Sequence, residues 1–275
     1  FREGGRIERN VKKLKPGKGI ELDIACRDGL AVRRPLTQGS ASASFGGGRY
    51  SSSFGIWSMP AQSVGNSPKL DGRLDDWKGI APAFIYTTHR ASGGYQLMQV
   101  RRGPSHIRDQ HDTGCSTLVQ WDQQNLYLAL KVQDDDLQFP KNEKEPGKGD
   151  RLTVCIDADL SGDLFDSKMS EDDFLISIEF AAESLQVTLV DSNGQRSPLG
   201  AAHALVKSGL ENGYVVELVC PWDKLGVRPR PGTTLGFDTT LYDADGSPDI
   251  QTESAWAGFN SGLLNPTGWG QLILR

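Results

Sequence analysis

The sequence predicts an all-β protein built as an antiparallel β-sandwich. Three observations lead to this fold class: short runs of β-branched and aromatic residues recur along the chain, turn sequences separate them, and no long amphipathic helix is visible. Glycine is abundant, with 32 residues among 275, and 14 prolines add further turn positions. This composition disfavours a helical bundle or a coiled coil.

Eight segments carry the strand pattern. In order along the chain they are residues 116–120, 126–132, 152–156, 174–180, 185–190, 214–219, 235–241 and 271–274. Sequences such as Asp-Gln-Gln-Asn, Ser-Asn-Gly-Gln and Glu-Asn-Gly lie between them and are typical of turns. Residues 221–225 form the one predicted helical turn, because a proline stands at its first position. Many short strands with so little helix favour a sandwich of two antiparallel sheets.

The charge of the chain changes near residue 60. Residues 1–60 hold 11 Lys and Arg against 5 Asp and Glu, whereas the remainder holds 19 against 30. A stretch rich in Pro, Ser and Gly, residues 59–68, lies at this change, so we place a domain boundary near Asn66. The predicted units are residues 1–66, a partial copy or tail of a preceding β-sandwich plus its linker, and residues 67–275, a complete sandwich.

A faint internal repeat supports the partial copy. The pattern that begins at Pro16-Gly17 recurs at Pro231-Gly232, and in both places an aromatic-glycine pair (Phe54-Gly55, Trp269-Gly270) follows 38 residues later. An unrelated N-terminal β extension is the alternative interpretation of residues 1–60.

Composition and motifs also exclude several classes of function. A formal charge of −5 argues against nucleic acid as a partner, and no apolar run approaches the roughly 20 residues that span a bilayer. No apolar segment opens the chain, so we expect any signal peptide to be absent or already removed. The four cysteines are too scattered for a disulfide scaffold. No nucleophile elbow, phosphate loop or zinc-protease motif is present, so we do not expect an enzyme.

A series of motifs resembles the family 9 carbohydrate-binding modules over about residues 68–275. In chain order the motifs are Leu70-Asp71-Gly72-Arg73-Leu74-Asp75-Asp76-Trp77, Gln120-Trp121-Asp122 with Asn125-Leu126-Tyr127-Leu128, Gly149-Asp150 before Ile156-Asp157, Gly213-Tyr214-Val215-Val216-Glu217, Leu235-Gly236-Phe237-Asp238 with Tyr242-Asp243-Ala244, Trp256, and Trp269-Gly270-Gln271-Leu272. The resemblance implies a sandwich of the DOMON-like group, a fold usually appended to extracellular glycan-degrading enzymes and often holding calcium.

The function implied by the resemblance is a non-catalytic, calcium-stabilised carbohydrate-binding module of a larger glycan-processing protein, such as an accessory domain of a glycoside hydrolase. Its expected partners are polysaccharide or oligosaccharide, bound weakly, and other domains of the same parent chain, with no nucleic acid and no membrane. The expected location is secreted or at the cell surface. Two alternatives stay open: a structural or interaction module that has lost sugar binding, and a DOMON-like haem domain, for which Met98 and Met169 lack a matching histidine.

The resemblance also shows what this chain lacks. The two tryptophans that stack on the sugar in the best-known family members correspond to Gly147 and to a position near Leu263, and neither is aromatic. Stacking on flat rings supplies much of the contact area in such sites. Five of the six tryptophans match large apolar positions of the family framework and are expected in the core, namely Trp77, Trp121, Trp222, Trp256 and Trp269. The sixth, Trp57, is expected outside the module.

The remaining candidates for a sugar site are short polar residues and the rings of Tyr242, Tyr95 and Phe139. The family's polar sugar contacts correspond to Thr153, Ser177 and Thr240, where the family uses longer side chains. Tyr242 shares strand parity with Thr240 and therefore points to the same face. The predicted site comprises Tyr242, Thr240, Asn265, Ser177 and Thr153. An ordinary exposed strand residue is the alternative interpretation of Tyr242.

An acidic loop carries the clearest chemical signal. In Asp157-Ala158-Asp159-Leu160-Ser161-Gly162-Asp163, oxygen side chains alternate as in loops that wrap calcium, and the glycine permits a sharp turn. Lys168 stands where an EF-hand would place its last glutamate, so another closing ligand is needed. The predicted calcium ligands are Asp157, Asp159, Ser161, Asp163, Asp172 and Asp173. A solvated acidic loop without metal is the alternative.

Two further segments carry weaker signals. The run Asp134-Asp135-Asp136 at a predicted strand end indicates a turn or a second cation site. Residues 87–114 form a long predicted loop that includes His106 and His111, and its five-residue histidine spacing fits neither one helix face nor one strand face. A loop that contacts a ligand is the functional alternative for this segment.

Overall fold

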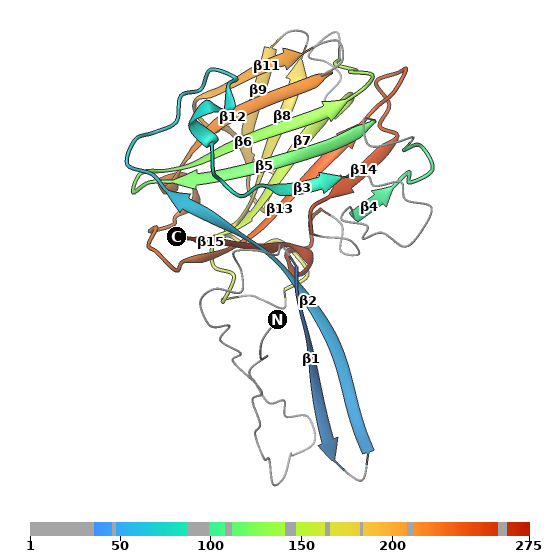
Figure 1. Cartoon of the computed structure of the whole chain (residues 1–275), viewed down its shortest axis with the longest axis vertical. Coiled ribbons are helices and arrows are strands. Elements are labelled where there is room, and N and C mark those ends of the chain that lie inside the picture. The colour runs from blue at the N-terminus through green and yellow to red at the C-terminus, as the bar shows by residue number, and fades with distance from the viewer. Residues whose placement is uncertain are drawn as a thin grey trace.

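Most strands of the described chain follow one path that curls into two packed layers, and β1, β3, β4 and β14 pair beside it (Figure 1). The computed structural model describes residues 36–45, 48–86, 99–107, 112–140, 147–162, 166–181, 184–207, 212–257 and 263–275. The path runs β10-β9-β8-β7-β13-β15-β2-β5-β6-β12-β11. We call the part up to β15 sheet I and the part from β5 sheet II, with β2 joining them. The predicted β-sandwich is therefore confirmed.

Sheet I is antiparallel and provides the face on which the candidate site lies. Its strands are β10 (Arg196–Pro198), β9 (Ser184–Val190), β8 (Asp173–Ala181), β7 (Arg151–Asp157), β13 (Thr234–Asp243) and β15 (Gly270–Leu274), with β14 (Thr252–Ala255) and β4 (Gln99–Arg102) added beyond β13. Sheet II contains β3 (Ala83–Tyr86), β5 (Thr113–Trp121), β6 (Asn125–Asp134), β12 (Gly213–Pro221) and β11 (Ala202–Lys207). The short helices are η1 (Leu74–Trp77), α1 (Trp222–Leu225) and η2 (Pro266–Gly268).

Strand β2 (Gly48–Ser63) joins the two sheets. Its residues 58–61 pair in parallel with β15, and residues 62–63 pair in parallel with β5. Met59 and Ala61 are buried in the main core, since alternate residues of a strand point to the same side. The sandwich therefore begins before the boundary predicted near Asn66. The polar and proline-containing composition of residues 59–68 indicated a linker, but its alternating apolar residues serve the core.

Strand β1 (Leu36–Phe45) pairs with β2, and the hairpin extends away from the sandwich (Figure 1). Residues 1–35 lie outside the described part of the chain. The predicted partial copy of a preceding sandwich in residues 1–66 consequently stays a prediction.

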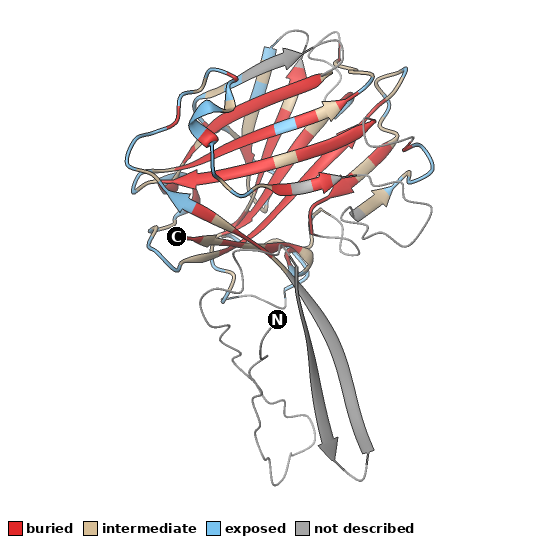
Figure 2. Cartoon of the chain, viewed as in Figure 1, coloured by how far each residue is buried: buried red, intermediate tan, exposed pale blue. Residues whose placement is uncertain are grey.

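Most buried apolar side chains form one cluster between the sheets (Figure 2). Alternation places Leu128 and Leu130 of β6 opposite inward residues of sheet I such as Phe237 and Leu241 of β13. The five tryptophans expected in the core are all buried, at most 7% exposed. Trp121, Trp222 and Trp256 lie in the main core, whereas Trp77 and Trp269 each belong to a smaller separate cluster.

The expectation for Trp57 is wrong. Its ring packs edge-on against the ring of Trp256, with 6.1 Å between the ring centres. Gly270 passes beside this pair, and a Cβ at that position would lie 2.7 Å from the ring of Trp256 and 2.9 Å from the carbonyl oxygen of Trp57. The contact shows that the sandwich extends to Trp57, and it explains why a glycine stands at position 270.

The outer face of sheet II is covered by the chain's own residues 64–80. Trp77 packs with Leu118, Tyr127 and Ala129 in a second apolar cluster. The buried carboxylate of Glu217 accepts hydrogen bonds from the backbone N–H groups of residues 71 and 72 at 2.9 and 2.6 Å, and from the indole N–H of Trp77 at 2.8 Å. Glu217, which belongs to the motif of residues 213–217, thus fixes the Asp71-Gly72 turn and Trp77 of the first family motif.

The eight predicted strands and the predicted helical turn are all present, with ends that differ by up to three residues. Several short strands were not predicted: β3, β4, β10, β11 and β14. The segment expected as a loop, residues 87–114, contains β4 and the start of β5, and its residues 87–98 and 108–111 lie outside the described part. No helix of the described chain is long and apolar enough to cross a membrane.

Candidate functional site

The outer face of sheet I gathers four of the five residues predicted to contact sugar. The strand register places Thr240 of β13 beside Thr153 of β7, and Thr153 beside Ser177 of β8. Tyr242 lies two residues along β13 on the same face, opposite Arg151. The residues between them point into the core, as strand alternation requires. Four of the predicted residues therefore lie in one continuous polar row, and their contact with sugar stays a prediction.

Asn265, the fifth predicted sugar residue, has a local structural role. It stands before η2, and its side-chain oxygen accepts hydrogen bonds from the backbone N–H of Thr267 at 3.2 Å and from the Thr267 hydroxyl at 2.8 Å. These contacts begin the short helix, as N-terminal capping residues do.

Arginine side chains cover the polar row. Arg101 of β4 donates to the Thr240 hydroxyl at 3.0 Å, and Arg196 of β10 donates to the Ser177 hydroxyl at 3.2 Å. Thr240, Ser177 and Thr153, which lies between them in register, are each less than 9% exposed. Sequence reasoning missed these arginines because they lie on two short strands that were not predicted.

One of the arginines belongs to a buried ion pair. The guanidinium of Arg101 lies 3.1 Å from a carboxylate oxygen of Asp238 and 3.3 Å from one of Glu253, and its side chain is 6% exposed. The other oxygen of Asp238 accepts two backbone N–H groups, those of residues 239 and 257. A buried charge requires such complete pairing. The ion pair therefore fixes β4 and β14 at the edge of the polar row.

The ring of Tyr242 is already stacked. The guanidinium of Arg151 lies 4.1 Å from the ring centre, and the residue is 7% exposed. Burial, with a further contribution from the charge of Glu253, raises the pKa of Tyr242 to about 12, so the phenol stays protonated near neutral pH. A saccharide approaching this side would meet the arginine rather than a bare aromatic face.

A hollow of about 430 Å³ opens beside Tyr242. Its lining residues are Arg102, Gly147, Lys148, Arg151, Tyr242, Asp249, Ile250 and Glu253. The volume is within the range typical of small-ligand sites. Gly147, which corresponds to a stacking tryptophan of the family, lies in this lining, and a Cβ there would have no described atom within 4 Å. The position that carries a ring in the family therefore contributes only backbone to this lining.

The other missing ring lies at the far end of the row. Leu263 packs on a small apolar cluster of Cys155, Leu175 and Trp269, and its carbonyl oxygen accepts a hydrogen bond from the Trp269 indole at 3.2 Å. This end of the face is therefore apolar, whereas the hollow is lined with charges.

The predicted calcium ligands lie where β7 ends and β8 begins. Asp157 and Asp173 face each other in register and are 2% and 0% exposed. The Asp157 carboxylate accepts the backbone N–H of Asp159 at 3.0 Å, and Asp159 accepts the Ser161 hydroxyl at 2.9 Å. Asp163 lies outside the described residues. Asp172, the last carboxylate of the predicted set, directly precedes Asp173 at the start of β8.

The donor set of this loop fits a hard cation. Every predicted ligand offers oxygen, which suits calcium better than zinc. A buried oxygen of Asp172 accepts no hydrogen bond within the described part of the chain, so it is available to a metal. The described residues nevertheless form no group of three whose ligand atoms lie within 4.8 Å of one another in this loop. Such groups occur instead at the opposite end of β7 and β13.

Comparison with known proteins identifies the family. Residues 92–275 match the model of the family described as carbohydrate family 9 binding domain-like. A family 9 carbohydrate-binding module from Caldicellulosiruptor kristjanssonii in complex with cellotriose has 19% sequence identity and a TM-score of 0.54, over 79% of this chain and 93% of that one. The complex of a family 9 module from the same organism with glucose has 18% sequence identity and a TM-score of 0.52, over 79% of this chain and 95% of that one. A search of curated proteins found no match.

A third structure, a putative carbohydrate-binding protein from Bacteroides uniformis, has 12% identity and a TM-score of 0.51, over 79% of this chain and 99% of that one. At these identities the likenesses establish the fold, and the family model establishes membership. Family 9 modules bind carbohydrate and are not catalytic, in agreement with the expectation of a non-enzymatic chain. The match extends over most of the chain, and the chain belongs to the carbohydrate family 9 binding domain-like family.

Proposed function

We propose that this chain is a non-catalytic carbohydrate-binding module that holds a saccharide in the hollow beside Tyr242. The observation that carries the proposal is the hollow itself, about 430 Å³ lined by polar and charged side chains at the end of the polar row on sheet I. Both family 9 structures reported above are complexes with a sugar, one with cellotriose and one with glucose. Fold alone does not establish function, so the lining must supply the chemistry.

The lining offers hydrogen-bond partners for sugar hydroxyls. Arg102, Lys148 and Arg151 are donors, while Asp249 and Glu253 are acceptors. A sugar hydroxyl both donates and accepts, so it can bridge a cationic and an anionic side chain in such a mixed lining. The Lys148 ammonium and an Asp249 carboxylate oxygen lie 3.0 Å apart, so one hydroxyl could contact both.

Arg151 is the residue best placed to orient a ligand. Its guanidinium stacks on Tyr242 and donates to the carbonyl oxygen of Gly147, so two contacts fix it at the edge of the hollow. A fixed donor loses less conformational entropy when a ligand binds. Hydrogen bonding through a preorganised arginine would thus replace part of the stacking that the missing rings supply in other members.

Weak affinity follows from this chemistry. Each lost stacking partner removes burial worth on the order of 1–3 kcal/mol. The loss of two rings from a micromolar binder therefore places the expected Kd in the millimolar range. We also propose that calcium binds in the loop of Asp157 and Asp173. The module is secreted or at the cell surface and is attached to a larger glycan-processing protein, such as a glycoside hydrolase.

A structural or interaction module that has lost sugar binding is the second candidate. It is favoured by the arginines that cover Thr240 and Ser177, because hydroxyls engaged in this way are not free to meet a sugar. The two candidates differ in whether any saccharide enters the hollow.

Titration calorimetry with short cello- and xylo-oligosaccharides separates the two candidates. The wild type should bind with a millimolar Kd, and Arg151→Ala should raise that Kd by about 10- to 150-fold, since a hydrogen bond from a charged group is worth about 1.5–3 kcal/mol. Lys131→Ala is the matched control, because Lys131 is exposed on the outer face of sheet II and should leave the Kd unchanged. No heat with any saccharide would favour the structural module. Micromolar binding that survives Tyr242→Ala would place the site elsewhere.

A further inference from the structure

One line of residues from four neighbouring strands crosses the hollow beside Tyr242. The strand register places Arg151 of β7 and Glu253 of β14 on either side of Tyr242 of β13. Arg102 of β4 pairs in turn with Glu253. Directly paired residues of antiparallel strands project to the same face of a sheet. An arginine therefore stands at each end of the line, and all four residues line the hollow.

An irregularity in β4 keeps two consecutive arginines on this face. Val100 pairs with Ser254 and Arg102 pairs with Glu253, so Arg101 is an extra residue between two adjacent pairs. Strand alternation alone would send Arg101 and Arg102 to opposite faces, whereas a β-bulge redirects one side chain. The Arg101 guanidinium lies 3.3 Å from a carboxylate oxygen of Glu253, while Arg102 lines the hollow. The bulge thus brings both cations to one edge of the site.

The two carboxylates that line the hollow already have cationic partners. Glu253 is paired with Arg101, as described above, and Asp249 lies 3.0 Å from the Lys148 ammonium. Neither carboxylate is therefore available to neutralise a further cation of the lining without giving up its own partner.

Arg151 has no such partner in the described chain. Its guanidinium contacts the ring of Tyr242 and the carbonyl oxygen of Gly147, and it forms no ion pair with a described carboxylate. Glu179, its neighbour in register on β8, lies 3.2 Å from Arg196 instead. Burial lowers the pKa of Arg151, and the nearby acidic groups offset only part of that shift. A partly buried cation in this position is stabilised by an anion that enters the hollow.

Arg102 is the second cation without a partner. It is exposed, and its side chain forms no hydrogen bond or ion pair with any residue that the structure describes. The described lining therefore holds two guanidinium groups whose charge no carboxylate of that lining offsets. The whole chain has a net charge of −5, so this positive excess is a local feature. Such an excess attracts an anionic ligand.

We propose that the hollow selects a saccharide that carries a carboxylate, a uronic acid, over a neutral sugar. This inference rests on the proposed function, because it assigns the ligand class of the same hollow. Arg151 binds the carboxylate through the N–H groups that do not donate to Gly147, since a guanidinium presents paired donors that match two carboxylate oxygens. Arg102 adds a second positive charge from β4. The ring hydroxyls contact Lys148 and Asp249.

Titration calorimetry of the full chain with two trisaccharides tests the preference. The ligands are cellotriose and the β-1,4-linked trimer of glucuronic acid, which has the same linkage and carries a carboxylate in place of each CH₂OH group. The wild type should bind the acidic trimer at least about tenfold more tightly, because hydrogen bonds to charged groups are stronger than neutral ones. Raising NaCl from about 50 mM to about 500 mM should reduce that ratio, because salt screens charges.

Three variants assign the preference to the arginines. Arg151→Gln keeps a hydrogen-bond donor but removes the charge, so the ratio of the two Kd values should fall to about one. A purely structural role for Arg151 would weaken both trimers equally and leave the ratio unchanged. Arg102→Gln should lower the ratio in part, and it serves if Arg151→Gln does not fold, because Arg102 is exposed. Lys131→Gln on the outer face of sheet II is the matched control and should keep the wild-type ratio.

The outcomes separate this inference from the proposed function. Cellotriose bound as tightly as the acidic trimer would overturn the preference and leave sugar binding intact, whereas no binding of either trimer would overturn both. Binding of the acidic trimer alone would support the preference. Sodium acetate bound as tightly as the acidic trimer would overturn it, because the hollow would then be a general anion site. A wild-type ratio in both Arg151→Gln and Arg102→Gln would also overturn it.

Discussion

The two outer faces of this sandwich differ in what covers them. We call the outer face of sheet II the closed face and the outer face of sheet I the open face. On sheet II, residues 64–80 cover the strands, Trp77 fills an apolar cluster, and Glu217 fixes the covering segment. On sheet I, the polar row is covered by single arginine side chains and ends in a hollow of about 430 Å³. The same fold thus closes one face with its own chain and leaves a charged hollow on the other.

Buried charge is used differently on the two faces. Glu217 is fully buried and accepts three N–H groups, so its charge serves to fix the chain in place. Asp238 is equally buried, but one of its partners is Arg101, which also contacts Glu253 at the edge of the hollow. Charge on sheet II therefore stabilises the fold, and charge on sheet I positions groups that a ligand can meet.

The largest expected effect on stability comes from the closed face. Glu217→Leu leaves three N–H donors without an acceptor, and each unsatisfied buried donor costs about 1–3 kcal/mol. We expect the free energy of unfolding to fall by about 3–5 kcal/mol, measured by urea denaturation. The matched control is Gln186→Leu on the exposed outer face of sheet I, which should change stability by no more than about 0.5 kcal/mol. A loss as small as the control's would show that the closing contacts are not needed.

The second effect concerns the ion pair at the edge of the hollow. Arg101→Met leaves Asp238 buried without its cation, and the free energy of unfolding should fall by about 3 kcal/mol. Adding Asp238→Asn should recover part of that loss, because the uncompensated charge is removed. Strictly additive losses in the double variant would contradict the ion-pair account.

The third effect is calcium dependence at the apolar end of the open face. Asp159→Ala should remove the share of calcium stabilisation that comes from the loop of Asp157, about 2.7 kcal/mol when calcium is 100-fold above Kd. Hydrogen exchange should then become faster at the ends of β7 and β8 and stay unchanged in β11 and β12. Equal acceleration on both sheets would mean that the loop does not act locally.

The sequence predicted the fold from its periodicity, and the reason is visible in the strands. Residues such as Leu128 and Leu130, or Phe237 and Leu241, alternate with outward residues, and this alternation is the signal that was detected. Strand parity also placed Tyr242 and Thr240 correctly on one face. Short strands such as β4 and β10 carry only three or four residues, too few for a period to be visible.

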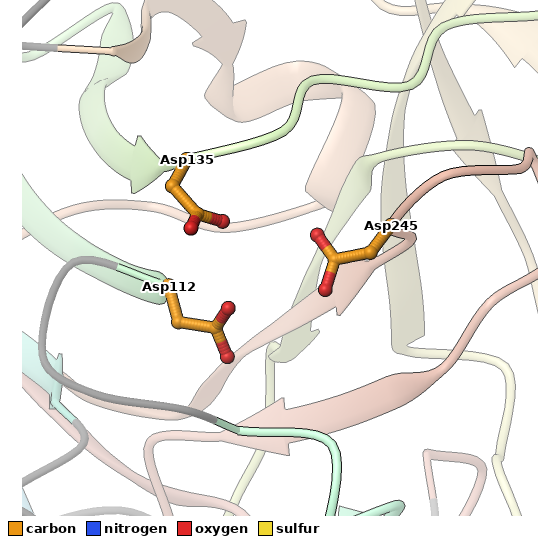
Figure 3. A group of neighbouring side chains, drawn as sticks. All are labelled: Asp112, Asp135 and Asp245. Atoms are coloured by element: carbon orange, nitrogen blue, oxygen red, sulfur yellow. The ribbon is translucent and has the colours of Figure 1, made fainter.

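The parts that could not be predicted depend on long-range contacts. Arg101 and Thr240 are far apart in the sequence, and only the pairing of β4 with β14 brings them together. Trp57 was assigned outside the module because the charge and composition change nearby, yet its ring contacts Trp256. Asp134 and Asp135 belong to the run of three aspartates that is visible in the sequence at the end of β6. The carboxylates that the fold brings beside them, Asp112 before β5 and Asp243 and Asp245 at the end of β13, are distant in the sequence (Figure 3).

Sugar binding on the open face is the central claim, and a two-dimensional amide NMR titration with cello-oligosaccharide tests it most directly. The account predicts concentration-dependent shifts at residues 147–151 and at Tyr242 and Glu253, with no shifts around Glu217 or Lys131 on the outer face of sheet II. Shifts confined to that closed face, or none at saturating millimolar concentrations of cello- and xylo-oligosaccharides, would contradict it.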